Sequence, residues 1–188
     1  MPTGVPALDA ALGGGLPAGR LTELVSTAAG TGGQLVLTRI LHATRHARQR
    51  VALIDAADCF APDSVPGDDL QHLVWVRPTA LTTALAAADV LVRDGNYAVV
   101  LLDLRGLAET ALRRTPATHW HRLHRAAESR PAAVLVQTTL ELVPAVPWRL
   151  VLREPLGLGA RRKPRDDLAA QLQVEIVRGQ VHVEELAG

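Results

Sequence analysis

A strand, a glycine-rich loop and a helix follow one another directly between residues 20 and 49, and no other feature of the sequence limits the fold as much. Arg20–Val25 (RLTELV) predicts a short buried strand, and Ser26–Gly33 (STAAGTGG) predicts a turn that depends on glycine. From about Gln34 to Gln49, apolar side chains recur at helical spacing. A strand that passes through a tight turn into a helix is the repeating unit of a parallel sheet covered by helices.

The rest of the chain continues this alternation. The strand YAVVLLDL, at 97–104, is the most apolar and is predicted to be central. Residues 172–183 alternate apolar and polar side chains around Arg178-Gly179, which predicts an antiparallel hairpin. Further strands are predicted at 50–55, 73–76, 132–139 and 149–153, and helices at about 81–95 and 116–128. The predicted fold class is therefore α/β, a mainly parallel sheet with flanking helices and a C-terminal antiparallel edge, in one domain over residues 1–188.

Composition narrows the class of protein. The 48% hydrophobic content is typical of a folded globular chain, and the single cysteine, Cys59, allows no internal disulfide, which fits a reducing cytoplasm. The chain shows no signal-peptide pattern and no apolar run of about 18 residues, so we expect a cytoplasmic protein without membrane contact. The net charge of +1 hides an uneven distribution, because residues 105–165 carry eleven Arg, one Lys and four acidic residues, a net charge of +8. This block is a candidate for contact with a polyanion.

The loop at 26–33 has the position of a phosphate-binding loop but not its side chains. The working motif, G-x-x-x-x-G-K-[ST], uses backbone N–H groups, a lysine for the β and γ phosphates and a hydroxyl for Mg²⁺. Gly32 stands where the lysine belongs and Gly33 where the Ser or Thr belongs, and the only lysine, Lys163, is distant in sequence. We expect a degenerate nucleotide site that includes Gly30 and Thr31, holds no metal or cofactor and does not hydrolyse ATP. The simplest interpretation is a glycine-rich turn between a strand and a helix, and the alternative is a backbone that attracts an anion weakly.

Acidic residues end two of the predicted strands. Asp103 ends YAVVLLD, the position that in phosphate-loop proteins holds the carboxylate for Mg²⁺, and Asp55 ends RVALID. Either carboxylate could instead cap a turn. Three histidines in THWHRLH lack the Cys or carboxylate partners that a zinc site needs, so no metal site is expected there.

Two basic clusters are candidates for DNA contacts. Both are predicted to lie in exposed loops, where guanidinium groups can make forked contacts with phosphates. Because few aromatic residues accompany them, binding should be electrostatic and strongly salt-dependent. The alternative is an ordinary solvated basic face. The clusters are Arg113 and Arg114 in one loop, and Arg161, Arg162, Lys163 and Arg165 in the other.

Residues 3–24, TGVPALDAALGGGLPAGRLTEL, resemble the RecA-family signature that leads into the phosphate loop. VALIDAADCFAP, YAVVLLD and VLVQTT resemble the later RecA strands, which puts Ala57 at the position of the catalytic acid and Gln137 at that of the nucleotide sensor. The lysine, the Ser or Thr and the catalytic acid are thus absent together. The resemblance implies a RecA-like fold in a member that does not hydrolyse ATP, a pseudo-ATPase.

RecA proteins also carry an N-terminal helix and strand that dock on a neighbouring subunit, and we expect this chain to lack that segment. The resemblance then implies an acceptor surface on the strand at 73–76 and the helix at 81–92. The alternative is that their apolar side chains face the core. The predicted partner-binding residues are Trp75, Leu81, Leu85 and Ala88.

Short, degenerate RecA-like chains also resemble ImuA-type proteins, accessory factors of translesion synthesis in the DNA damage (SOS) response. That resemblance implies an ImuB-like Y-family polymerase homologue that docks in trans, with a DnaE-type polymerase and single-stranded DNA as further candidate partners. Three alternatives stay open. They are a SulA-like inhibitor that binds a tubulin-like division protein, an atypical ATPase that receives the missing cation in trans, for instance from Arg178, and a RecA-like scaffold for another partner.

Overall fold

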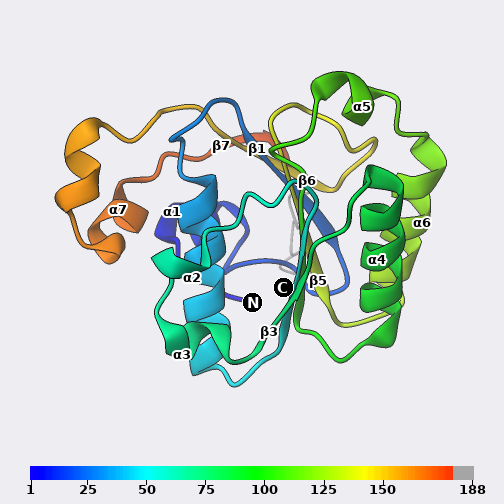
Figure 1. The fold of residues 1–188 in the computed structure, drawn as a ribbon, viewed down its shortest axis with the longest axis horizontal. Helices are drawn as coiled ribbons and strands as arrows, with labels where there is room; N and C mark the ends of the chain where they lie inside the picture. Colours follow the sequence, from blue (N-terminus) through cyan, green and yellow to red (C-terminus); the bar gives the residue numbers. More distant parts are fainter. Residues whose placement is uncertain (180–188) are drawn as a thin grey trace, which may run out of the picture.

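The computed structural model describes residues 1–179, which form three layers, with a sheet between two groups of helices (Figure 1). The strands are β1 (Leu21–Ser26), β2 (Val51–Asp55), β3 (Leu73–Val76), β4 (Val99–Asp103), β5 (Ala133–Thr138), β6 (Trp148–Leu152) and β7 (Glu175–Arg178). The helices are α1 (Pro6–Ala11), α2 (Gly33–His46), α3 (Gly67–Leu70), α4 (Leu81–Asp94), α5 (Glu109–Arg113), α6 (Ala117–Glu128) and α7 (Arg165–Gln171), with 3-10 turns η1 (Pro62–Ser64) and η2 (Leu158–Arg162). No helix in this part of the chain is long and apolar enough to cross a membrane.

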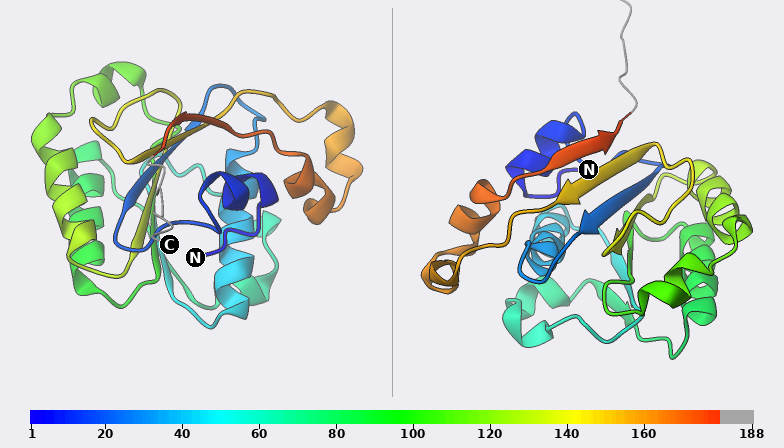
Figure 2. Two further views of the ribbon diagram at one scale, coloured as in Figure 1. Left: turned by 180° about the vertical axis from the view of Figure 1, so that it is seen from behind. Right: turned by 90° about the horizontal axis from the view of Figure 1, so that it is seen from above.

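The seven strands follow the order β3-β2-β4-β5-β1-β6-β7, and the view from above shows β7, β6 and β1 side by side (Figure 2). The first six are parallel, and β7 runs antiparallel to β6. The predicted fold class is therefore confirmed. The apolar strand β4 is interior, between β2 and β5, although the middle place of the sheet belongs to β5.

The sheet separates two apolar cores. Helices α1, α2, α3 and α7 cover one face, and α4, α5 and α6 cover the other (Figure 1). Because side chains alternate along a strand, β4 contributes Leu101 to the first core and Leu102 to the second. Every residue of β1, β2, β4 and β5 is buried, as expected for parallel strands covered on both faces.

Some short elements differ from the sequence-based prediction. The segment around Lys163 was expected to be a loop, but it contains η2 and the start of α7, which begins after Pro164 with Asp166 in its first turn. A helix start is indicated by a proline followed by acidic residues in the first turn. The cluster of arginines had instead suggested an exposed loop. Of the predicted hairpin, the first half forms β7, and the second half lies outside the described residues.

Candidate functional site

The degenerate nucleotide site lies at the carboxyl ends of the parallel strands, where open α/β sheets bind their ligands. β1 ends there at Ser26, and the register aligns Asp55 with Asp103 and Asp103 with Gln137 on neighbouring strands. A cavity of about 530 Å³ lies beside them, lined by the loop at 28–33 and by Arg105. The fold thus brings together the residues predicted for the degenerate nucleotide site.

The loop turns into α2 through two glycines in the left-handed region. Gly30 and Gly32 have φ values of +81° and +104°, which favour glycine, and the 14-residue helix α2 begins at Gly33. The first N–H groups of a helix attract anions. The Thr31 hydroxyl donates to the carbonyl of Ala28 at 2.9 Å, so it closes the turn instead of pointing to a ligand.

The space for the missing lysine is filled by another side chain. A Cβ atom added at Gly32 would lie less than 3.0 Å from Cδ2 of Leu172. Leu172 follows α7 and is buried. A lysine at Gly32 would therefore meet both an unfavourable φ and an occupied space.

The space for the missing Ser or Thr is filled as well. A Cβ atom added at Gly33 would lie less than 3.0 Å from Nη1 of Arg105 and 2.8 Å from Oγ of Ser26. Arg105 lies two residues after the end of β4, and its guanidinium group reaches the start of α2 at Gly33. Glycine at this position therefore makes room for a guanidinium group.

Arg105 also forms hydrogen bonds with the carboxylate of Asp103, which was predicted to bind Mg²⁺. Its Nε donates to Oδ1 of Asp103 at 2.8 Å, its Nη2 donates to Oδ2 at 2.6 Å, and its backbone N–H donates to Oδ1 at 3.1 Å. Asp103 is only 1% exposed. Burial acts to lower the pKa of Arg105, but the hydrogen bonds to Asp103 and its charge outweigh burial and raise the pKa above its usual value, so the guanidinium stays charged.

Arg105 was not predicted as a site residue, because in the sequence it is only one of the arginines of the basic block at 105–165. A signal was present, because an arginine two residues after the acid at the end of a strand can fold back onto that acid. The arginine can fill the nucleotide site only because residue 33, far away in the sequence, is a glycine. Neither Arg105 nor Gly33 alone therefore predicts that the site is filled.

Several polar atoms around the cavity keep unused hydrogen-bonding capacity. Gln137 donates through Nε2 to the carbonyl of Gly33 at 3.2 Å, while its Oε1 has no partner among residues 1–179. The same holds in this range for Oγ of Ser26 and the side-chain amide of Gln34. By contrast, Asp55 is satisfied, because its carboxylate accepts the N–H groups of two residues in the turn that follows β2. Within residues 1–179, no three His, Cys, Asp or Glu side chains are placed to hold a metal ion.

The two predicted DNA-binding clusters are not brought together. Arg114 follows α5, and the other cluster spans η2 and the start of α7, at opposite sides of the molecule in Figure 1 and in the view from above in Figure 2. Arg113 is paired with Glu109, and Lys163 donates to Gln171, so both have neighbours on their own or an adjacent element. Arg162 and Arg165 are exposed, and the side chain of Arg161 lies outside what the structure describes.

The predicted partner-binding residues divide into surface and core. β3 is one edge of the sheet, and Val74 on it is 41% exposed. Leu81, at the start of α4, is partly buried. Leu85 and Ala88 are buried against the sheet, at 6% and 0% exposure, and this corrects their assignment to the partner surface. They face the second core because α4 packs that side on β2 and β4.

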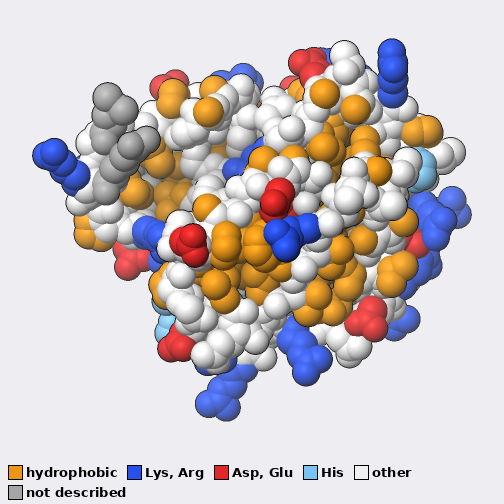
Figure 3. All heavy atoms as spheres, viewed as in Figure 1, with side chains coloured by type: hydrophobic (Ala, Val, Ile, Leu, Met, Phe, Trp, Pro, Cys, Tyr) orange, Lys and Arg blue, Asp and Glu red, His pale blue; other side chains and the backbone are white. Residues whose placement is uncertain are grey.

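A different residue supplies the exposed apolar surface of α4. Val90 is 64% exposed, and hydrophobic side chains gather on the face of the molecule over β3 and α4 (Figure 3). Trp75 is partly buried, with its ring centroid 5.4 Å from that of Phe60 and the guanidinium of Arg77 over its face at 4.7 Å. Trp75 therefore supports the edge strand as well as contributing to its surface.

Comparison with known proteins agrees with this architecture. The RecA N-terminal domain family matches residues 1–111. Protein RecA of Leifsonia xyli subsp. xyli is 38% identical over 109 residues, and that of Acidothermus cellulolyticus is 38% identical over 106 residues; both matches cover 55% of this chain. They cover 29% and 30% of those relatives, so the match spans less than a third of their length. The chain belongs to the RecA family, through the N-terminal domain of that family.

Proposed function

We propose that this protein is a non-hydrolysing RecA-family adaptor that takes up a partner on the open edge of β3. The observation that carries the proposal is the edge itself. Within residues 1–179 no strand pairs with the outer side of β3, and Val74 exposes an apolar side chain there. An open edge strand with apolar surface is a template for an added strand of another chain.

The geometry of the nucleotide site supports the non-hydrolysing half of the proposal. A phosphate-loop enzyme needs a lysine and a Mg²⁺ ion to stabilise charge on the transferred phosphate. Here Leu172 occupies the space that a lysine at position 32 would enter. Arg105 donates hydrogen bonds to Asp103, the acid predicted to bind Mg²⁺. Rearrangement of both side chains would have to precede any ordinary ATPase geometry.

We further propose that the adaptor serves translesion synthesis in the DNA damage response. Membership of the RecA family and the resemblance to ImuA-type proteins support this role. In this proposal an ImuB-like Y-family polymerase homologue contributes the segment that adds to β3, and a DnaE-type polymerase and single-stranded DNA are further partners. SulA-like binding of a tubulin-like division protein is the competing function, and no feature of β3 or α4 within the described residues favours it.

Replacement of Val74 by Asp tests the edge strand. We expect V74D to weaken binding of the ImuB-like homologue from the same genome at least about tenfold, because a charge would be buried where the partner strand packs. V177D is the matched control, since Val177 has the same exposure of 41% on β7, at the opposite edge of the sheet. Affinity is measured with purified proteins by isothermal titration calorimetry, and melting temperature shows that both variants are folded.

Equal binding by wild-type protein and V74D would place the partner surface elsewhere. Binding of the division protein in place of the polymerase homologue would support the competing function. Trp75→Asp is a poorer test, because Trp75 packs on Phe60 and its loss would also weaken the fold.

A further inference from the structure

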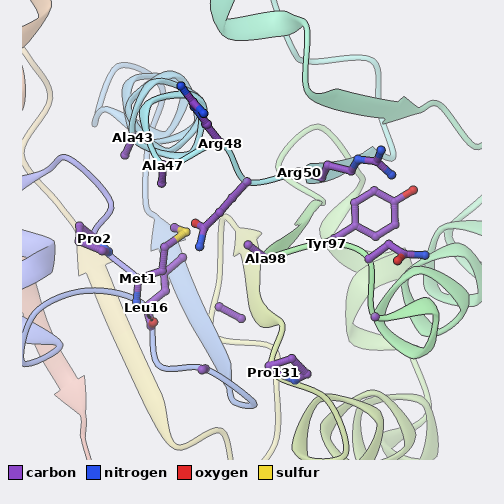
Figure 4. A pocket seen from close by; sticks show the side chains of 15 residues that line it. Met1, Pro2, Leu16, Ala43, Ala47, Arg48, Arg50, Tyr97, Ala98 and Pro131 are labelled. Carbon is purple, nitrogen blue, oxygen red and sulfur yellow. Dashed lines mark hydrogen bonds between the residues drawn. The ribbon is translucent and has the colours of Figure 1, made fainter.

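A groove lies at the amino ends of the strands, at the other end of the sheet from the degenerate nucleotide site. One hollow of about 780 Å³ lies between the end of α2 and the segments that lead into β2, β4 and β5 (Figure 4). A second hollow of about 570 Å³ shares Arg48, Gln49, Arg50 and Tyr97 with the first and extends to Val74. We call the two together the amino-end groove.

The described lining of this groove is basic and contains no acidic residue. Three arginines line it: Arg45, Arg48 and Arg50. Arg45 donates to the neutral amide oxygen of Gln71 at 3.0 Å, and within residues 1–179 the side chains of Arg48 and Arg50 have no hydrogen-bond or ion-pair partner. Burial, and then the charge of Arg45, lowers the pKa of His72, which also lines the groove. Asp68 and Asp69 lie nearby, in an adjoining hollow that Arg45 and Arg48 also line, but the lining of the amino-end groove itself offers its arginines no carboxylate.

Arg48 has a backbone conformation that is unfavourable for a residue with a side chain. It follows the last residues of α2 with a φ of +54°, in the left-handed region where helices usually place glycine. The negative end of the α2 dipole favours a cation there, but a side chain in this region still carries strain. Such strain is often found where a residue acts on a ligand.

The floor of the groove is apolar. Leu16, Ala43 and Ala133 contribute to it, and Figure 4 shows Leu16 and Ala43 on one side with Arg50 and Tyr97 on the other. We propose that the amino-end groove binds an extended acidic segment of a protein partner, with carboxylates on Arg48 and Arg50 and an apolar side chain on this floor. Guanidinium groups bind carboxylates through paired hydrogen bonds, and the apolar contact supplies hydrophobic free energy.

Two features favour a peptide over other anions. The two hollows share four lining residues and together reach from Leu16 to Val74, so an extended chain can occupy both at once. Nucleic acid would place phosphates on the arginines, but it has no aliphatic side chain for the floor, and among the described residues Tyr97 is the only aromatic ring in the groove for base stacking besides the imidazole of His72. The inference does not depend on binding at β3, although the groove ends at Val74 and one partner could use both surfaces.

Selection from a random dodecapeptide library displayed on phage, with the purified wild-type protein as target, tests the proposal. Enriched peptides are labelled with fluorescein, and their affinity is measured by fluorescence anisotropy for wild-type protein, R48G/R50Q and R114Q. The R48G substitution should not disturb folding, because glycine is the residue most favoured at the φ of Arg48. R114Q is the control, since Arg114 is an exposed arginine beside α5.

We expect the enriched peptides to combine acidic and apolar residues, to lose at least about tenfold in affinity for R48G/R50Q and to bind R114Q as tightly as wild type. The proposal is overturned if no peptide is enriched, if the peptides lack acidic residues, or if R48G/R50Q binds them unchanged. It is also overturned if a 20-nucleotide oligo(dT) binds the wild-type protein more tightly than the peptides and depends on Arg48 and Arg50. Polymerase binding that is lost in V74D but retained in R48G/R50Q separates this site from the edge of β3.

Discussion

Replacement of Asp103 by Ala is expected to lower the free energy of unfolding by about 3–5 kcal/mol, because it leaves the guanidinium of Arg105 partly buried without its partner. Both carboxylate oxygens of Asp103 accept hydrogen bonds from that guanidinium, at 2.8 and 2.6 Å, and Asp103 is 1% exposed. Urea denaturation of wild-type protein and D103A at neutral pH measures the difference.

The double variant D103L/R105L distinguishes the cost of an unpaired buried charge from the cost of changed packing. Replacement of a buried ion pair by apolar residues is often neutral or stabilising, so the double variant should recover most of the loss seen in D103A. A loss below about 1 kcal/mol in D103A would contradict a buried pair and would match the weak coupling of exposed ion pairs.

Restoration of the two missing motif residues, by Gly32→Lys and Gly33→Thr together, is expected to leave ATP turnover at background and to destabilise the protein. The threonine introduced by G33T would displace Arg105 from Asp103, and the lysine introduced by G32K would collide with Leu172 at a φ of +104°. Each substitution should cost about 2–4 kcal/mol. Phosphate release and urea denaturation measure the two effects.

Two other glycines provide matched controls for these substitutions. Gly14 has a φ of +117° and no neighbour within 4 Å of an added Cβ, so G14K should show the backbone strain alone, about 1–2 kcal/mol. Gly67 is the first residue of α3 and is equally open, so G67T is the control for G33T. ATP turnover above background in G32K/G33T would contradict our interpretation, because it would mean that Arg105 and Leu172 move aside readily.

The sheet was predictable because its strands are uninterrupted apolar runs that end in turn residues, as in Val51–Asp55 and Val99–Asp103. The long helices α2, α4 and α6 were predictable from their periodicity. The short helices α1, α5 and α7 have only five to seven residues, which give fewer than two full turns of pattern.

For the nucleotide site, the sequence predicted only which functional side chains are missing. Gly32 and Gly33 show in sequence that the lysine and the hydroxyl are missing, but Arg105 and Leu172 reach them through packing of distant segments. The faces of α4 were not predictable either. That helix is rich in alanine and apolar on more than one side, so only the structure shows that Ala88 faces the core.

The place of β1 in the sheet has a consequence for synthesis of the protein. Both neighbours of β1, β5 and β6, come from residues 133–152, after the segment that carries the family match. In a nascent chain that ends at residue 111, β1 therefore has no neighbouring strand, and β5, which connects β1 to β4 in the complete sheet, is missing. We expect the chain to stay sensitive to protease, and dependent on chaperones, until β6 has left the ribosome. A gene fragment cut at the boundary of the family match would then encode an aggregating polypeptide.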